Sequence, residues 1–581
     1  MDQYEIDKLL KQIAELKQEV KASKKYGLVW DKEKNPEEVV EACKTKIPVI
    51  NFLGDKQVIN GGKGNVIIEG DNFHSLTALS CIYQNSIDLI YIDPPYNTLN
   101  KDFVYNDICV DLDDGYRHSK WLSFMHRRLV LARGLLKDDG LFFVSIDENE
   151  QANLKILCDS VFGERHFICC FIIDKTAQGA NQSVSFKQQH EYCLLYAKNS
   201  SNSINTDVED DIDYKKFKYK DNKGYYAITN SFDSINSPLS ANKKRGYTVY
   251  YNEATKDALI RDEFDPVKLQ FGPYDEDLIS KGYTPIRPGI RKGVQYPWNW
   301  ERNRFLSDYK EELVFIKNRK GVLSIYHKNR AKGKTKDTTI KRFDTRQFGN
   351  QMLVDILGSK KFDYPKSVDM MKWVVSKHKS NEALILDFFA GSGTTGQAVL
   401  ELNKEDGGNR RFILCTNNEN NICTDVTYPR LKTVITGIRP DGSKYSDGIP
   451  SNLYYFKTGF VEDLNNSDQA KYNLAEKVDS LLCIAEDIFD EKERNDYSSH
   501  FVSSNRKRHL FIYNDYFKKE KFDEFKKRVI KADGEKVVYV FSFDNNLDES
   551  LFDDKSINVK PIPEKIYEIY KEIAESIKRG E

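Results

Sequence analysis

Residues 384–396 read LILDFFAGSGTTG, an apolar run followed by a glycine-rich turn. The apolar run predicts a short buried strand at 384–387, and the letters that follow the turn predict a helix. Gly391, Gly393 and Gly396 have the spacing of a dinucleotide-binding turn, in which glycines permit a tight bend and the close approach of a ligand to the backbone. By itself, this spacing is compatible with a nicotinamide enzyme or with an ordinary strand-to-helix turn.

Predicted strands and helices alternate on both sides of a long polar stretch. Strands and helices that alternate with short turns indicate a parallel α/β sheet. Further strands are predicted at 65–71, 87–92, 141–146 and 411–415, helices at 121–136, 367–377 and 394–402, and two more strands near the C-terminus at 509–513 and 537–543.

The polar stretch divides the chain into domains. Residues 200–360 lack the alternation and are rich in Lys, Asn and Tyr, so we expect an insertion that interrupts the sheet domain and carries specificity. A predicted helix at 3–22 has apolar residues spaced by seven, and it packs either on its own domain or on a partner. The expected order is an N-terminal helical arm (1–50), a first half-domain (51–204), the insertion (205–360), a second half-domain (361–455) and a C-terminal α+β region (456–581).

Composition excludes several classes of protein. The 581 residues include 88 basic and 89 acidic ones, and the net charge of −1 excludes a uniformly basic, histone-like protein but permits a local basic face. No stretch approaches the roughly 20 uncharged residues of a membrane helix, and the N-terminus lacks a signal-peptide pattern, so we expect a cytoplasmic protein without a membrane partner. No Cys-x-x-Cys pair occurs, and no metal site is predicted.

Asp93, Pro94, Pro95 and Tyr96 follow the predicted strand at 87–92. Two prolines stop a strand and stiffen the turn, so a rigid loop is the simplest interpretation. The same residues also suit a nucleobase amine, which is a poor nucleophile because its lone pair is delocalised into the ring. In that interpretation, the carboxylate of Asp93 and the carbonyl of Pro94 accept the two N–H hydrogens of the amine. Tyr96 then stacks on the base.

The residues around the glycine turn favour an adenosyl ligand with a charged amino-acid tail over a dinucleotide, because the aromatic letters DFFA precede the first glycine. Asp387 is suited to attract an α-ammonium group. Glu419 is suited to accept hydrogen bonds from ribose hydroxyls, and a solvated loop acid is an equal interpretation of it. The phosphate-binding loop of ATPases is absent, since the GKT at 333–335 lacks the first glycine that this motif requires.

The motif DPPYNT at 93–98, together with DFFAGSG at 387–393, resembles the amino-methyltransferases of DNA, which use S-adenosylmethionine (AdoMet). The four residues Asp93–Tyr96, called the tetrad below, precede the glycine motif in the sequence. This order is similar to that of the permuted β class. The resemblance implies a Rossmann-like sheet with the two motifs on neighbouring strands and a target base flipped out of the DNA. It extends to EGDN at 69–72, HEY at 190–192 and FDYPK at 362–366.

The resemblance implies roles for individual residues. The catalytic group is Asp93, Pro94, Pro95 and Tyr96. The target-base pocket is lined by His190 and Tyr192. The residues that bind AdoMet are Asp71, Asn72, Lys366, Asp387, Phe388, Phe389, Ala390, Gly391, Ser392, Gly393, Thr394 and Glu419.

A basic run at 327–346 lies in the insertion, and charged residues alternate with aromatic ones upstream of it. Such a run is usually a solvated loop, but it is also able to neutralise several phosphates, and inside a specificity insertion we favour contact with DNA. The residues assigned to DNA are Trp298, Arg302, Lys328, Arg330, Lys332 and Lys334.

Residues 24–30 (KKYGLVW), residues 402–411 and the C-terminal region narrow the resemblance to the modification subunits of Type III restriction–modification systems. That family implies N6 of adenine in double-stranded DNA as the target and a homodimer. We also expect association with the nucleoid, a separate helicase–nuclease restriction subunit, since no nuclease or helicase motif is found, and no metal for methylation. The tetrad alone equally allows N4 of cytosine. An orphan adenine methyltransferase and a non-catalytic DNA-specificity subunit stay open, and a nicotinamide oxidoreductase ranks last because it leaves the tetrad unexplained.

Overall fold

The computed structural model divides the chain into two compact units, one formed by residues 1–205 and 338–581 and the other by residues 206–337. The predicted helix at 3–22 lies outside the described residues. Within the described ranges, no helix combines the length and apolar character that crossing a bilayer requires. The described residues are 37–98, 104–105, 108–109, 116–175, 189–209, 216–318, 321–331, 334–462, 473–475, 477–503, 507–514, 519–541, 552, 557–562 and 564–579.

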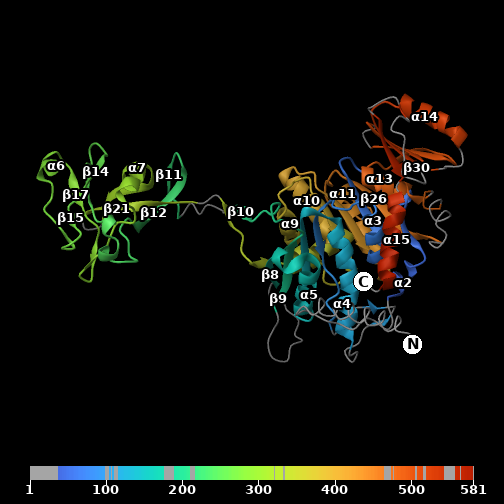
Figure 1. Cartoon of the computed structure of the whole chain (residues 1–581), viewed down its shortest axis with the longest axis horizontal. Coiled ribbons are helices and arrows are strands. Elements are labelled where there is room, and N and C mark those ends of the chain that lie inside the picture. Colours follow the sequence, from blue (N-terminus) through green and yellow to red (C-terminus); the bar gives the residue numbers. More distant parts are fainter. Residues whose placement is uncertain are drawn as a thin grey trace, which may run out of the picture. The chain divides into compact units, whose positions relative to one another are not determined.

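Eleven strands of the described residues form the central sheet of the larger unit (Figure 1). Its path is β1 (Ile47–Phe52), β26 (Asn452–Val461), β3 (Gly64–Glu69), β25 (Arg411–Thr416), β24 (Leu384–Asp387), β4 (Ile87–Ile92), β7 (Leu136–Ile146), β9 (His190–Ala197), β8 (Phe167–Lys175) and β23 (Ile340–Phe343), with β2 (Val58–Ile59) paired to β26. The six strands from β26 to β7 run parallel to one another. This confirms the predicted parallel α/β sheet.

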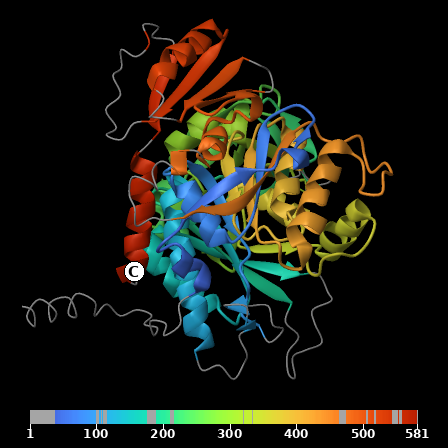
Figure 2. The same cartoon turned by 90° about the vertical axis from the view of Figure 1, so that its right-hand side faces the viewer.

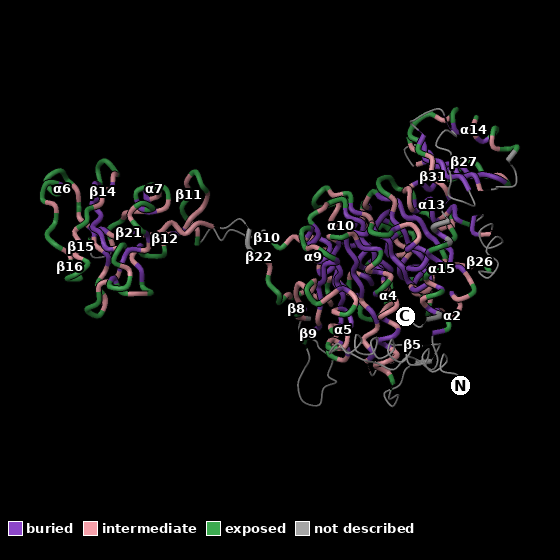
Figure 3. Tube along the Cα trace, viewed as in Figure 1, coloured by how far each residue is buried: buried purple, intermediate pink, exposed green. Residues whose placement is uncertain are grey.

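Helices cover both faces of this sheet, which explains why β4 is buried along its whole length and reads as a continuous apolar run. The two apolar cores lie on opposite faces of the sheet, and the buried strands run between the helical layers in Figure 3. One core packs on α3 (Asn72–Ser80), α4 (Arg117–Leu135) and α5 (Gln151–Cys158), and the other packs on α8 (Met352–Leu357), α9 (Val368–Ser376), α10 (Thr394–Asp406) and α11 (Tyr428–Thr436).

The C-terminal region adds a second, five-stranded sheet to the same unit. Its core is continuous with that of α3 and α4, and Figure 2 shows α15 (Glu564–Arg579) beside these blue-to-cyan helices. The hydroxyl of Tyr570 donates to the carbonyl of Pro48 over 2.5 Å. The elements are α13 (Asp479–Glu486), β27 (Asp490–Arg494), β28 (Ser498–Val502), β29 (Arg508–Tyr513), α14 (Phe522–Lys531), β30 (Glu535–Phe541), β31 (Ile557–Ile562) and α15; α2 (Glu38–Ala42), β5 (Val104–Tyr105) and β6 (Ile108–Cys109) complete the unit.

The boundary of the insertion differs from the expected 205–360. The smaller unit ends at Asp337, because the next strand, β23, pairs in parallel with β8 at the edge of the central sheet. The helix α8 that follows then packs in the core with α9 and α11. Residues 338–360 therefore belong to the larger unit.

The smaller unit has its own aromatic core, built around Trp298, Trp300 and Phe305. Its sheets are antiparallel, so hairpins rather than crossover helices connect the strands. The elements are β10 (Asp207–Glu209), β11 (Tyr219–Asp221), β12 (Gly224–Ser231), β13 (Thr248–Tyr251), β14 (Ala258–Arg261), β15 (Phe264–Asp265), β16 (Gln270–Phe271), α6 (Glu276–Ser280), β17 (Thr284–Ile286), β18 (Ile290–Arg291), β19 (Val294–Gln295), α7 (Arg302–Glu312), β20 (Leu313–Lys317), β21 (Leu323–Arg330) and β22 (Lys334–Lys336).

Candidate active site

The two predicted motifs meet at one edge of the central sheet. Strands β4 and β24 are parallel neighbours, with Leu386 opposite Ile90. Asp93 follows the end of β4, and Asp387 is the last residue of β24. Carboxyl ends of adjacent parallel strands are where open α/β sheets bind their ligands. The expectation that the motifs lie on neighbouring strands is confirmed.

A hydrogen-bonded cluster fixes the tetrad. The hydroxyl of Tyr96 donates to Oδ1 of Asp93 over 2.7 Å and lies 3.1 Å from Oε2 of Glu191. The Nζ of Lys366 lies 2.6 Å from the hydroxyl of Tyr96, 2.9 Å from Oε2 of Glu191 and 3.1 Å from Oδ1 of Asp93. One ammonium therefore stands among two carboxylates and a phenol.

Electrostatics keep this cluster in defined protonation states. Burial by itself disfavours the ammonium of Lys366, but the carboxylates of Asp93 and Glu191 outweigh burial and hold its pKa above the usual value. Burial, followed by the same two carboxylates, raises the pKa of Tyr96 well above its usual value. At neutral pH the phenol is thus a donor and the lysine a cation.

The loop leaves two acceptors of the tetrad available. The indole Nε1 of Trp121 donates to the carbonyl of Pro95 over 2.7 Å and so anchors the loop. Oδ1 of Asp93 is occupied by Tyr96 and Lys366, and the Asp93 side chain keeps 29% of its surface exposed. Among the described residues, no donor hydrogen-bonds to Oδ2 of Asp93 or to the carbonyl of Pro94. These two oxygens are the acceptors predicted for a nucleobase amine.

The glycine turn depends on a left-handed backbone. Gly391 has φ 48° and Gly393 has φ 76°, values that L side chains rarely adopt. At Gly396, a Cβ would lie 2.9 Å from Leu431, so this glycine serves close packing of α10 instead. Gly391 and Phe389 are half-buried, whereas Phe388, Ala390, Ser392 and Thr394 are buried. The surface available to a ligand is therefore the backbone of the turn together with the ring of Phe389.

Asp387 is a buried carboxyl, and no cation of the described residues pairs with it. Its oxygens accept hydrogen bonds from the amide of Phe389 over 3.0 Å and from the hydroxyl of Thr395 over 2.6 Å. Burial, with a smaller contribution from Asp93, raises the pKa of Asp387 to about 7 despite these two donors. A ligand with an ammonium group would supply the missing charge.

Arg430 holds the glycine turn in place through hydrogen bonds, a role that sequence analysis missed. Its fully buried guanidinium donates to the hydroxyls of Thr394 and Ser392 over 2.7 Å and 3.1 Å and to Oε1 of Gln397 over 2.7 Å. No carboxylate among the described residues forms an ion pair with it, and its Nη2 has no hydrogen-bond partner there. Burial lowers the pKa of Arg430 to about 10, so it remains a cation at neutral pH.

Four other residues were predicted to bind AdoMet, and they lie in different surroundings. Asp71 caps α3 by accepting from the amide of Phe73 over 2.7 Å, and Oδ1 of Asn72 accepts from the buried Arg128 over 2.5 Å. Both side chains therefore make hydrogen bonds that stabilise the fold just after β3. Glu419 is exposed shortly after β25. Lys366 contacts the tetrad rather than the glycine turn.

Strand β9 presents Glu191, not its two neighbours, to the tetrad. Successive side chains of a strand point to opposite faces, so His190 and Tyr192 lie on the other face, where Nε2 of His190 is 3.1 Å from the hydroxyl of Tyr192. Their assignment to the target-base pocket stays a prediction. A buried acid within the apolar strand HEYCLLYA was the available signal for Glu191.

Several residues assigned to DNA are engaged inside the smaller unit. Trp298 is buried, and its Nε1 donates to the carbonyl of Tyr247 over 2.8 Å, so it is a core residue and not a DNA contact. Arg302 forms an ion pair with Asp262. Lys332 and the side chain of Lys334 lie outside the described residues.

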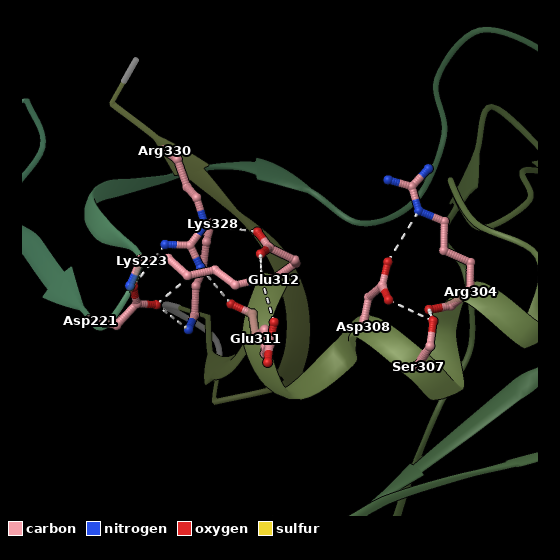
Figure 4. Close-up of polar contacts among 9 residues, drawn as sticks. All are labelled: Asp221, Lys223, Arg304, Ser307, Asp308, Glu311, Glu312, Lys328 and Arg330. Carbon is pink, nitrogen blue, oxygen red and sulfur yellow. Dashed lines mark hydrogen bonds and ion pairs between the residues drawn. The ribbon is translucent and has the colours of Figure 1, made fainter. Parts of the chain in front are cut away.

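Lys328 and Arg330 belong to an internal ion network (Figure 4). Asp221 binds Lys328 at 2.8 Å and Arg330 at 2.7 Å, and Nε of Arg330 lies 2.9 Å from Glu312. Lys223 pairs with Glu312 at 3.1 Å and also with Glu311. Each positive charge has a carboxylate, so the network joins β11, β21 and α7 and leaves little charge for phosphates.

Comparisons with known proteins agree with the motifs. The profile of a family described as DNA methylase (N6_N4_Mtase) matches residues 87–427. The Type III restriction-modification enzyme EcoPI Mod subunit of Escherichia phage P1 is 31% identical over 63% of this chain and 59% of its own length. The StyLTI Mod subunit of Salmonella typhimurium is 28% identical over 70% of this chain and 63% of its own length. The chain thus spans about three-fifths of these two relatives.

Two further similarities complete the comparison. The Type II methyltransferase M.KpnI of Klebsiella pneumoniae is 34% identical over 68% of this chain and 88% of its own length. Among solved structures, the cytosine-N4-specific PvuII DNA methyltransferase aligns with a TM-score of 0.31 and 12% identity, over 63% of this chain and 86% of that one.

Proposed function

The chain belongs to the DNA methylase family, and on that premise we propose that it transfers the methyl group of AdoMet to N6 of an adenine flipped out of double-stranded DNA. The observation that carries the proposal is the state of Asp93. One of its oxygens is held by Tyr96 and Lys366, while the other is without a hydrogen bond among the described residues, at the end of the strand next to that of Asp387.

The site fits AdoMet by its charges. The buried Asp387 has no cationic partner in the part of the chain that the structure describes, and it suits the α-ammonium of the amino-acid tail. The backbone of Gly391 is accessible, and the exposed Glu419 suits ribose hydroxyls at the end of the next strand. When bound, AdoMet supplies an electrophilic methyl group on a sulfonium.

The tetrad supplies activation of the amine. Oδ2 of Asp93 and the carbonyl of Pro94 accept the two N–H hydrogens, which draws the nitrogen toward tetrahedral geometry and frees its lone pair. The new N–C bond forms as the C–S bond breaks, and the surplus proton then leaves the nitrogen for water. The carboxylate of Asp93 stabilises the positive charge that develops on the amine. Tyr96, anchored through its hydroxyl, offers its ring to the flipped base.

The wider assignment follows the names of the similar proteins. Two of them are Mod subunits of Type III restriction-modification enzymes, which supports a modification subunit that acts with a separate helicase–nuclease restriction subunit. A homodimer and an association with the nucleoid in the cytoplasm belong to the same proposal. No group of three or more His, Cys, Asp or Glu in the described part of the chain is arranged to hold a metal ion.

A methyl-transfer assay tests the proposal. Purified protein is mixed with isotope-labelled AdoMet and mixed-sequence duplex DNA, and the digested nucleosides are analysed by mass spectrometry. Label in N6-methyladenine is the expected result. Label in N4-methylcytosine would keep the mechanism and overturn the adenine assignment. Absence of label with the restriction partner supplied, while AdoMet still binds, would favour a non-catalytic specificity subunit.

A further inference from the structure

Two short hairpins of the smaller unit expose apolar side chains. In the hairpin β15–β16, Val267 is 88% exposed. In the hairpin β18–β19, Ile290 is 68% exposed and Val294 is 43% exposed. Exposed apolar side chains mark candidate contact surfaces, and the charges around them decide what each hairpin is able to bind.

The two hairpins have opposite electrostatic surroundings. Residues 261–277, which contain β15–β16, include six acidic and two basic residues. Residues 232–246 and 288–299, which surround β18–β19, include one acidic and five basic residues. A polyanion would be repelled from the first hairpin and attracted to the second.

Backbone hydrogen bonds and an ion pair join the two basic segments. The amide of Trp298 donates to the carbonyl of Arg245 over 3.1 Å, and the amide of Ser234 donates to the carbonyl of Pro297 over 2.8 Å. Arg291 of β18 reaches back to Asp233 at 2.7 Å. The short helical turn Lys243–Arg245 therefore lies next to the segment that follows the β18–β19 hairpin.

The surface has a rigid stem and free cations. Lys292 and Gly293 both have positive φ, 48° and 76°, which is the conformation of a tight two-residue hairpin turn. Nε2 of Gln295 donates to the carbonyl of Pro288 over 2.6 Å and closes the stem. The one acid, Asp233, is taken by Arg291, and within the described part of the chain Lys243, Lys244 and Lys292 have no ion-pair partner. This contrasts with Lys328 and Arg330.

We propose that the surface made by the β18–β19 hairpin and Lys243–Arg245 is the element that reads DNA sequence. A two-stranded β-ribbon fits the major groove. Ile290 and Val294 point to opposite faces of this ribbon, so the one that faces the base edges contacts the methyl group of thymine. The lysines Lys243, Lys244 and Lys292 bind flanking phosphates, which position the ribbon without reading sequence. This inference rests on the proposed DNA methyltransferase function and names the residues that select its site.

Three variants of the full chain separate the roles. The variant K243Q/K244Q/K292Q removes the free cations. The variant I290S/V294S changes the exposed apolar side chains of the β18–β19 hairpin, and V267S/K268Q is the matched control on the acidic hairpin. Binding to duplex DNA is measured across salt concentrations, and the positions methylated in a genomic DNA pool are sequenced. The thermal shift on adding AdoMet reports that the larger unit is folded in each variant.

The lysine variant is expected to bind at least tenfold more weakly and to flatten the salt dependence by about 0.9 for each phosphate that it no longer neutralises. The serine variant keeps the salt dependence but methylates a different or broader set of sequences. The control behaves like wild type in both assays. An unchanged salt slope in the lysine variant, or an unchanged sequence set in the serine variant, overturns the inference. If wild type itself neither binds nor methylates DNA, the proposed function fails first, so the two failures are distinguishable.

Discussion

Lys366 and Glu191 form a buried ion pair, with Nζ of the lysine 2.9 Å from Oε2 of the glutamate. The pair joins the segment before α9 to strand β9, and the same ammonium is 3.1 Å from Asp93. Lys366 therefore links a buried acid of the central sheet, Glu191, to Asp93 of the tetrad. Lys366 and Glu191 contact Asp93 and Tyr96, so we expect them to affect the reaction by holding these two residues in place.

Removing both partners of this pair is expected to cost less stability than the sum of the two single removals. Glu191→Gln leaves the ammonium with one carboxylate fewer, and loss of a buried partner typically costs about 3–5 kcal/mol. Lys366→Met leaves two carboxylates and the hydroxyl of Tyr96 without their cation. The double variant E191Q/K366M should lose less stability than the sum of the single variants, measured by urea unfolding, while methyl transfer stays impaired because Asp93 is no longer held. Additive losses of stability would contradict the coupling.

The division between catalysis and cofactor binding predicts two distinct defects. Asp93→Ala removes the acceptor for the amine and should lower kcat by about 100-fold or more, with AdoMet affinity near that of wild type. Gly391→Asp forces a side chain into a left-handed position 3.6 Å from Phe362 and should abolish AdoMet binding. Calorimetric titration with AdoMet and single-turnover kinetics check the pair. Wild-type turnover in D93A would refute the catalytic role of Asp93.

Local sequence patterns were sufficient for the sheet and both motifs. The strand at 384–387 is found as predicted, because a short apolar run before a glycine turn has few other solutions in a buried parallel sheet. The end of the insertion was misplaced because β23 is too short and polar to read as a strand. It is set by pairing with β8, which is distant in sequence. No local pattern reports such a pairing.

Residue roles were harder to predict than elements. Basic residues at 328 and 330 look like DNA contacts in the sequence, but Asp221 and Glu312 neutralise them across strands and a helix. Glu191 was noted only as part of HEY at 190–192, without a role of its own, and Arg430 was not noted at all, because burial, not residue type, makes these two residues significant. The hairpin at 290–295 lies in the upstream stretch where charged and aromatic residues alternate, but no sequence pattern shows that Lys243–Arg245 lie next to that stretch.

AdoMet binding should depend on pH through Asp387. Its pKa of about 7 in the free protein exceeds the usual value of 3.8, so near pH 6 the carboxyl is protonated and must lose the proton to pair with an ammonium. Affinity is expected to rise about tenfold per pH unit up to pH 7 and then level off, with release of about one proton at pH 6. Titration calorimetry in buffers of different ionisation enthalpy measures both. A pH-independent affinity in wild type would contradict this role.

The raised pKa of Asp387 affects the stability of the fold in the opposite direction: stability falls over the pH range in which AdoMet affinity rises. A folded pKa above the unfolded one means that the native state holds the extra proton, so the contribution of Asp387 to stability is complete below pH 3.8 and is lost as pH rises through about 7. Asp387→Asn removes this loss. The variant should therefore gain stability relative to wild type between pH 5 and 8 while binding AdoMet weakly. Unfolding curves across that range provide the control for the binding measurement.

Arg430 is expected to act on cofactor affinity. Arg430→Met leaves the hydroxyls of Ser392 and Thr394 without their donor, and each buried group left unsatisfied costs about 1–3 kcal/mol. The Kd for AdoMet should rise at least tenfold while kcat at saturation changes little, and Arg430→Lys should recover part of the affinity. Arg410→Met is the matched control, since Arg410 pairs with Asp406 near the other end of α10. Equal loss of affinity in both variants would indicate a general packing role instead.

The ion network of the smaller unit should support its stability without contributing to the salt dependence of DNA binding. Hydrogen bonds from Arg330 and Lys328 hold the pKa of Asp221 well below its usual value, so the carboxylate is charged at neutral pH and its contribution is lost only as pH falls below that usual value. The network is partly exposed, so Arg330→Gln should cost about 1 kcal/mol of stability, seen as a lower Tm. Because Arg330 is already neutralised by Asp221 and Glu312, the slope of log K against log salt should match wild type. A slope reduced by about 0.9 in R330Q would place this residue on a phosphate after all and return the basic run at 327–346 to the DNA-binding surface.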